Sequence, residues 1–239
     1  MHIDINCDMG EGIGNDEALL SFITSANIAC GFHAGDEETI RTTILLAKKN
    51  GVNIGAHPSF SDRENFGRTE IKCSMKEVYD LITAQLVLFK KIADDCGATV
   101  RHIKPHGALY NMAARDRQMA KAVAQAVKDF DNNLILFGLS KSVSIEEASA
   151  LGLRTCNEVF ADRTYQDDGS LTPRSQPNAL IEDEKKAVLQ ALQMVKKKTV
   201  ATISGKEISI VAETICIHGD GKHAVQFAEH LYQAFNILF

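Results

Sequence analysis

Residues 99–111 read TVRHIKPHGALYN, and this pattern indicates how the chain folds. In an extended backbone, successive side chains point to opposite sides, so His102, Lys104 and His106 share one face. The polar face of an ordinary strand carries small polar residues rather than two imidazoles and an ammonium group. We therefore predict a strand that directs these groups into an enclosed polar space. Lys104 and His106 lie at its C-terminal end and belong to the site, whereas His102 lies one layer deeper and supports them.

Short apolar runs alternate with segments of helical periodicity along the rest of the chain. Strands are expected at residues 2–6, 26–30, 52–56, 99–104, 133–138, 153–160 and 213–218. Helices are expected at residues 36–51, 74–97, 182–198 and 223–235. Asp36 opens the first of these helices, and a capping box formed by Ser74 and Glu77 opens the second. Residues 199–211 hold two β-rich runs around Ser-Gly-Lys-Glu, which predicts a hairpin.

The order of these elements predicts an α/β fold. Parallel strands need a crossover of a dozen or more residues, which the intervening helices supply. Seven repetitions favour either a barrel or a doubly wound sheet. Because no repeat or linker rich in proline and glycine divides the chain, we expect one domain over residues 1–239.

Charge and cysteine usage exclude several classes of protein. The net charge is −5 and no lysine- or arginine-rich run is present, so we expect neither a nucleic-acid partner nor an anionic membrane partner. The six cysteines form no Cys-x-x-Cys pair, which favours reduced thiols. The N-terminus lacks the pattern of a signal peptide, and no apolar run reaches the roughly 20 residues of a membrane-spanning helix. We therefore expect a soluble cytoplasmic protein.

Polar and glycine-rich clusters follow six of the seven predicted strands. The clusters are NCDMGEG (6–12), GFHAGD (31–36), HPSFSDRENFGR (57–68), PHGALYN (105–111), EVFADRTYQDDGSL (158–171) and HGDG (218–221). The carboxyl ends of the strands in a parallel α/β fold lie on one side, where ligands bind. We therefore expect the six clusters to converge on one site.

Each candidate residue in these clusters also has a plain structural interpretation. Asn6 and Asp8 are spaced to face the lumen together, but Asp8 could instead close the strand with an Asx-turn. His33 and His57 are each a candidate metal ligand, acid or base, or hydrogen-bonding group for substrate. Glu158, Asp162 and Arg163 could form either a positioned carboxylate with its ion pairs or a simple loop salt bridge. His218 and Asp220 add a further histidine and carboxylate, and the glycines Gly31, Gly35, Gly55, Gly107 and Gly219 allow either close approach of a ligand or a turn.

Several common motifs are absent. Lys222 follows HGDG without the spacing of a Walker A loop, and neither His-Glu-x-x-His nor Gly-x-Ser-x-Gly occurs. A metal site built from histidine and aspartate is compatible with the sequence, although the spacing of these residues matches no specific metal-binding motif.

The polar blocks, taken in order, closely resemble those of the LamB/YcsF family. They are DINCDMGEGIG, NIACGFHAGD, GAHPSFSDRENFGR, IKPHGALYN, EVFADRTYQDDGSL with Arg174, and CIHGDG, which together span residues 4–221. The resemblance implies an irregular seven-stranded β/α (TIM-like) barrel akin to those of glycoside hydrolases and polysaccharide deacetylases. It also implies the activity of an ATP-hydrolysing 5-oxoprolinase, a hydrolase that opens the lactam of 5-oxo-L-proline to give L-glutamate and works with partner subunits B and C.

Under this resemblance, the candidate residues receive hypothetical roles. Asp8 and Glu158 are candidates for the base that activates water, and Lys104, supported by Arg163, would neutralise phosphate or an oxyanion. His57 and His106 would act as acid or hydrogen-bond donors. The expected substrate-binding residues are Asn6, Gly31, His33, Gly55, Arg68, Arg163, His218 and Asp220. If a divalent metal is bound, its expected ligands are Asp8, His33 and His57.

Cofactor and partner expectations follow the same resemblance. ATP is expected to belong to the complex, since this chain lacks a recognised ATP-binding loop, and glycine-rich strand ends could contribute backbone N–H groups to a phosphate pocket. The rival predictions are a stand-alone metal-dependent deacetylase or amidohydrolase and a carrier subunit without catalysis. The sequence leaves the oligomeric state open.

Overall fold

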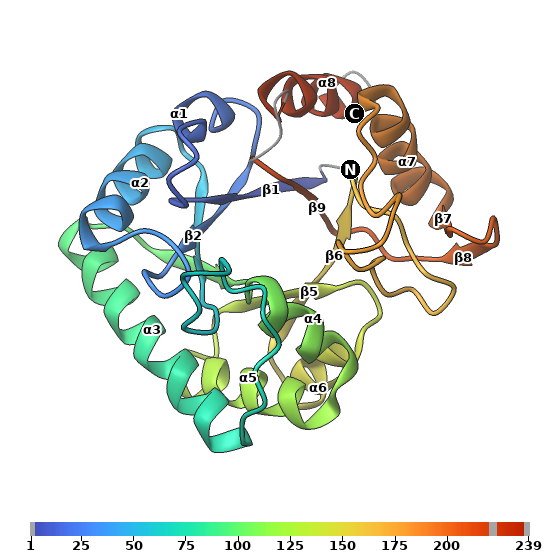
Figure 1. The fold of residues 1–239 in the computed structure, drawn as a ribbon. Helices are drawn as coiled ribbons and strands as arrows, with labels where there is room; N and C mark the ends of the chain where they lie inside the picture. The colour runs from blue at the N-terminus through green and yellow to red at the C-terminus, as the bar shows by residue number, and fades with distance from the viewer. Residues whose placement is uncertain (1–2, 220–223, 237–239) are drawn as a thin grey trace.

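A closed barrel of seven parallel strands forms the centre of the molecule (Figure 1). The computed structural model describes residues 3–219 and 224–236. The barrel strands are β1 (Asp4–Met9), β2 (Ser25–Ala29), β3 (Asn53–His57), β4 (Val100–Ile103), β5 (Ile135–Leu139), β6 (Arg154–Phe160) and β9 (Thr214–Ile217). They are hydrogen-bonded in that order, and β9 pairs with β1 to close the ring. The predicted seven-stranded β/α barrel is confirmed.

Helices cover the outside of the barrel in the ring that Figure 1 shows. They are α1 (Asp16–Leu19), α2 (Glu37–Lys49), α3 (Met75–Asp95), α4 (Gly107–Arg115), α5 (Arg117–Phe130), α6 (Val143–Ala150), α7 (Glu184–Lys197) and α8 (Ala224–Asn236). The Asp36 carboxylate accepts a hydrogen bond from the Thr39 N–H, and Ser74 with Glu77 forms the predicted capping box. Among the described residues, no helix combines the length and apolar character needed to cross a membrane.

The predicted hairpin is also confirmed. Strands β7 (Thr199–Ala201) and β8 (Glu207–Ser209) form a separate antiparallel pair beside α7 at the edge of the molecule (Figure 1).

Alternation along the barrel strands separates an apolar outer layer from a polar lumen. In β1, Ile5, Cys7 and Met9 belong to the hydrophobic core, whereas Asn6 hydrogen-bonds across the lumen with Thr214 and Asn27. Barrel interiors are usually filled by branched apolar side chains. Here hydrogen-bonded polar side chains occupy part of that space, so their partners have to be supplied within the barrel.

Gly55 creates the room for the deepest of the three polar groups on β4. A Cβ at Gly55 would lie 2.1 Å from Nε2 of His102, and the register between β3 and β4 shifts at Ile54 and Gly55. The His102 ring also stacks on Phe137, with 4.2 Å between ring centroids. The sequence predicts Gly55 as a substrate-binding position, but in the structure the His102 ring fills the space beside it.

We expect Gly55→Ala to lower the free energy of unfolding by about 3 kcal/mol, because the new methyl group has to displace a buried imidazole. Urea denaturation measures the change. Gly138→Ala is the matched control, since the nearest atoms to its added Cβ would lie at 3.2 Å rather than at 2.1 Å. The same substitution should destabilise a His102→Ala background much less. Equal effects of Gly55→Ala in both backgrounds would contradict this packing account.

Candidate active site

A cavity of about 1210 Å³ opens at the carboxyl ends of the barrel strands. Its lining includes Asp8, Glu11, His57, Arg68, Lys104, His106, Tyr110, Phe160, Arg163, Arg174 and His218. These residues lie at or after the ends of β1, β3, β4, β6 and β9. His33, after β2, lies against this group with its ring stacked on that of His106, 3.9 Å between centroids. The structure thus brings the described residues of the six predicted clusters to one end of the barrel.

Lys104 is the buried cation at the centre of this end. Its Nζ lies 2.8 Å from Asp8 Oδ1 and 2.9 Å from Glu158 Oε1, so the ammonium joins carboxylates from β1 and β6. Burial lowers the pKa of Lys104, but Asp8, Cys216 and Glu158 raise it, and the net pKa lies well above its usual value. The ammonium is therefore charged at neutral pH.

Asp8 is held as a carboxylate by the groups around it. Besides Lys104, the side-chain N–H of Asn27 donates to Oδ1 at 2.9 Å, and Oδ2 lies 3.3 Å from Nε2 of His57. Burial raises the pKa of Asp8, whereas His57 and Lys104 lower it, and the net pKa lies well below its usual value. An ionised carboxylate therefore lies at the wall of the cavity.

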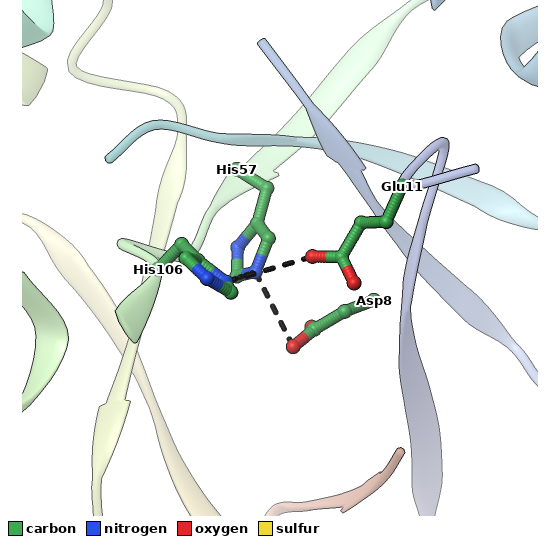
Figure 2. A group of neighbouring side chains, drawn as sticks. All are labelled: Asp8, Glu11, His57 and His106. Atoms are coloured by element: carbon green, nitrogen blue, oxygen red, sulfur yellow. Dashed lines mark hydrogen bonds and ion pairs between the residues drawn. The ribbon is translucent and has the colours of Figure 1, made fainter. Parts of the chain in front are cut away.

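His57, His106 and Glu11 complete a compact group with Asp8 (Figure 2). Nε2 of His57 lies 2.9 Å from Nδ1 of His106, and Nδ1 of His106 lies 3.6 Å from Glu11 Oε1. Burial, His57 and His33 lower the pKa of His106 well below its usual value, so its ring is neutral. The four side chains come from the ends of three strands and point toward one another.

The turn after β4 sets the position of His106. Gly107 follows with a φ of +57°, and a Cβ there would lie 2.4 Å from the carbonyl oxygen of Gly67. The N–H of Ala108 donates to the same carbonyl at 2.9 Å. Phe66, which precedes Gly67, has a φ of +57°, and its carbonyl accepts from Nε2 of His106 at 2.9 Å. A strained loop and a glycine therefore fix the ring of His106 together.

His33 supports Glu11 rather than facing the cavity. Its Nε2 lies 3.2 Å from Glu11 Oε1, and its Nδ1 lies 2.8 Å from the Ser59 hydroxyl. Burial, followed by the charge of His57, lowers the pKa of His33 to about 3. The His33 ring thus bridges the Glu11 carboxylate and the Ser59 hydroxyl.

Arg163 and His218 also line the cavity, and His218 lies near Asp8 because β9 pairs with β1. Arg163 donates to the backbone carbonyls of Thr172 at 2.6 Å and of Ala179 at 3.2 Å, and burial with the nearby Arg174 lowers its pKa to about 10. Nδ1 of His218 lies 2.7 Å from Asp162 Oδ2. Burial raises the pKa of Asp162, but His218 and Arg163 bring it below its usual value. His218 is thus oriented by an ionised partner.

Some predicted residues occupy places that differ from the sequence-based expectation. Glu158 is fully buried against Lys104 and is not part of the cavity lining, which removes the reason for assigning it as the base. Asn6 is also fully buried, and its side chain bonds other lumen residues. The Gly31 carbonyl accepts from Arg63 instead of lining the cavity. Asp220 lies outside the described residues.

Sequence reasoning missed the roles of three residues. Glu11 lies within the first predicted cluster, two positions after β1, but received no role of its own. Asn27 donates to both Asn6 and Asp8 and lies 2.8 Å from His102 Nε2, a bridge that strand alternation could have suggested. The Tyr110 hydroxyl is buried, and burial with nearby Glu158 raises its pKa well above its usual value. Tyr110 lies on α4, and its position in the fourth cluster was the only feature of the sequence that pointed to a place near the site.

A family model, a named relative and a solved structure each match nearly the whole chain. The LamB/YcsF family matches residues 3–237. A protein of Geobacillus kaustophilus that is named as the A subunit of 5-oxoprolinase is 51% identical over 236 residues, covering 97% of this chain and 92% of the relative. The crystal structure of a lactam utilization protein from Thermus thermophilus superposes with a TM-score of 0.92 at 40% identity, covering 100% of this chain and 97% of that one.

A more distant likeness concerns the fold alone. A family 4 carbohydrate esterase from Streptomyces lividans matches with a TM-score of 0.50 at 10% identity, covering 99% of this chain and 88% of that one.

The buried histidines predict how stability depends on pH. Burial and Lys104 lower the pKa of His102 from 6.5 to about 3 in the folded state. Below pH 6.5 the His102 side chain therefore binds a proton in the unfolded chain but not in the folded one. The contribution of His102 to the free energy of unfolding is complete at neutral pH and is lost as the pH falls toward about 3. We expect His102→Gln, which keeps an N–H donor for Asn27, to reduce the slope of unfolding free energy against pH by about 1.4 kcal/mol per unit below about pH 5.5.

Urea titrations at several pH values measure this slope. His230→Gln is the control, because His230 is more than half exposed. A slope that His102→Gln leaves unchanged would contradict the assignment of a neutral buried ring.

Proposed function

The chain belongs to the LamB/YcsF family, and from this premise we propose that it is the A subunit of a 5-oxoprolinase. In this proposal its cavity hydrolyses the lactam bond of 5-oxo-L-proline to give L-glutamate, with ATP as the second substrate. The observation that carries the proposal is the similarity at about half of all positions to relatives of that name, over 97% of the chain. Because the relatives are named as one subunit, we further propose that partner subunits, B and C, complete the enzyme.

The chemistry of a lactam explains why such a site needs ATP. An amide is a poor electrophile, and transfer of the terminal phosphoryl group of ATP to its oxygen would convert the carbon into a reactive centre. Water then attacks the carbon, the bond between carbon and nitrogen breaks as nitrogen takes up a proton, and a second water hydrolyses the resulting acyl phosphate. The site has to supply a base for water, a cation near the phosphate and an acid for nitrogen.

Asp8 and His57 are suited to act as the base. Both line the cavity, and Asp8 Oδ2 lies 3.3 Å from His57 Nε2, so a proton taken from water can be shared between them. Glu158 does not line the cavity, so its role becomes that of positioning Lys104.

Lys104 supplies the cation. It lines the cavity, stays charged, and is fixed by two carboxylates, so it needs no reorganisation when negative charge develops on the phosphorylated oxygen. His218, oriented by Asp162, lines the same cavity near Asp8 and is our candidate donor to the leaving nitrogen.

The place of ATP within the complex is also a proposal. Arg68, Lys141, Arg163, Arg174 and Lys206 line the cavity together with Lys104 and give its wall several positive charges. The same lining holds the carboxylates of Asp8, Glu11, Glu70, Asp167, Asp168 and Glu207, so these cations would bind phosphate as individual charge partners and not as a uniformly positive wall. We propose that the phosphate end of ATP enters the cavity while the partner subunits hold the rest of the nucleotide.

Reconstitution tests the proposed activity. The chain is combined with its partner subunits, and glutamate released from 5-oxoproline is measured with and without ATP. We expect release that needs both ATP and the partners. ATP-independent deacetylation of an acetylated substrate by the isolated chain would instead favour the metal-dependent amidohydrolase, and release from 5-oxoproline without ATP and partners would also contradict the proposal.

Within the reconstituted enzyme, Asp8→Asn and Lys104→Ala should each reduce turnover by about 100-fold or more, since each removes a charge at the reacting centre. Lys76→Ala is the matched control, because the Lys76 side chain is exposed on α3. Complex assembly is followed by size-exclusion chromatography. Turnover near that of the wild type would remove the substituted residue from the mechanism, whereas a loss of turnover with assembly and 5-oxoproline affinity intact excludes a carrier role.

A further inference from the structure

The ring nitrogens of His57 and His106 that face the cavity are both left without a proton by their backbone contacts. Nδ1 of His57 lies 2.6 Å from the carbonyl oxygen of Lys104, and Nε2 of His106 lies 2.9 Å from that of Phe66. A carbonyl oxygen only accepts hydrogen bonds, so each of these nitrogens carries the proton of its ring. Where each ring holds a single proton, Nε2 of His57 and Nδ1 of His106 are therefore bare.

These two bare nitrogens lie 2.9 Å apart. Two lone pairs at this distance repel each other unless a cation interacts with both. Asp8 Oδ2 and Glu11 Oε1 approach the same nitrogens, at 3.3 Å and 3.6 Å respectively. Figure 2 shows the four side chains converging. A single shared proton can bridge only one of these contacts, whereas a metal ion can interact with all four atoms.

The spacing of the four ligand atoms fits one metal ion. The candidate ligand atoms all lie within 4.8 Å of one another. Zinc bonds to imidazole nitrogen and carboxylate oxygen are about 2.0–2.2 Å long, so adjacent ligand atoms of a tetrahedral site lie about 3.3–3.6 Å apart. The three contacts of 2.9, 3.3 and 3.6 Å are close to this edge length.

The surrounding residues orient each ligand in the way that metal sites require. Both histidines donate their other N–H to backbone carbonyls, a common arrangement for metal-bound imidazoles. Asp8 Oδ1 accepts from Asn27 and Lys104, which leaves Oδ2 directed at the histidines. Asp8 and Glu158 together carry one negative charge more than Lys104 neutralises.

The geometry points to a binding site for one divalent transition-metal ion of the zinc class, with Asp8, Glu11, His57 and His106 as its ligands. Two imidazoles and two carboxylates form a donor set for a borderline cation such as Zn²⁺ or Co²⁺ rather than for Ca²⁺. The sequence-based set of Asp8, His33 and His57 is therefore revised, because His33 bonds to Glu11 and Ser59 and lies behind the site. This inference goes beyond the proposed function, since metal binding is measured without turnover. While an ion is bound, Asp8 and His57 would hold it in place of their proposed role as the base.

Metal titration of the full chain tests the site. The chain is freed of metal with EDTA, and Co²⁺ is added while visible absorption is recorded, followed by calorimetric titration with Zn²⁺. We expect one ion per chain with submicromolar Kd and the intense visible bands of four- or five-coordinate Co²⁺. His106→Ala and Glu11→Gln should each weaken binding by about 100-fold or more, as expected for loss of a ligand.

Matched variants separate this site from its neighbours. His230→Ala removes a largely exposed histidine, and Cys216→Ser removes the thiol of a second group that Asp8, Cys216 and His218 form. Neither variant should change the Kd, and no thiolate-to-cobalt absorption should appear in the near ultraviolet. Circular dichroism confirms that each variant is folded, and Glu11→Gln keeps the side-chain volume if His106→Ala does not fold. Absence of stoichiometric binding, equal affinity of the ligand variants, or dependence on Cys216 would each overturn the proposal.

Discussion

The interactions of Lys104 hold the reactive end of the barrel together. Its ammonium joins Asp8 of β1 to Glu158 of β6, its backbone N–H donates to the Ala56 carbonyl of β3, and its own carbonyl accepts from His57. Lys104 thereby places a positive charge at this end of the barrel, holds the carboxylates of Asp8 and Glu158, and sets which nitrogen of the His57 ring faces the cavity. Removing a partner from such a buried pair leaves an uncompensated charge, so the arrangement depends on every member being present.

The polar lumen beneath Lys104 serves as a rigid support. Asn27 donates to Asn6 and Asp8 and contacts His102, whose ring occupies the space beside Gly55. Buried polar networks with satisfied hydrogen bonds restrict their members to one arrangement. The side chains that face the cavity therefore rest on a base that does not have to rearrange when a ligand enters, which suits electrostatic catalysis and metal binding alike.

Local pattern was enough to predict the strands, the hairpin and the convergence of polar clusters, because alternation and helix caps are encoded over a few residues. The burial of Glu158 was not predictable, since it depends on the register of β6 with its neighbouring strands, which decides how far along the barrel axis Glu158 lies from Lys104. Glu11 acquires its place from the loop after β1, and His106 from the strained turn at Phe66. His33 and His57 end similar strands in the sequence, and only the structure shows that His33 bonds to Glu11 and Ser59 whereas His57 lines the cavity.

The central claim is that backbone carbonyls fix the two facing imidazoles so that their bare nitrogens point at each other. A long-range ¹H–¹⁵N spectrum of the histidine rings in the labelled full chain, recorded near neutral pH, reads the protonated nitrogen of each ring directly. The account predicts a proton on Nδ1 of His57 and on Nε2 of His106. A proton found on Nε2 of His57 or on Nδ1 of His106 would contradict it.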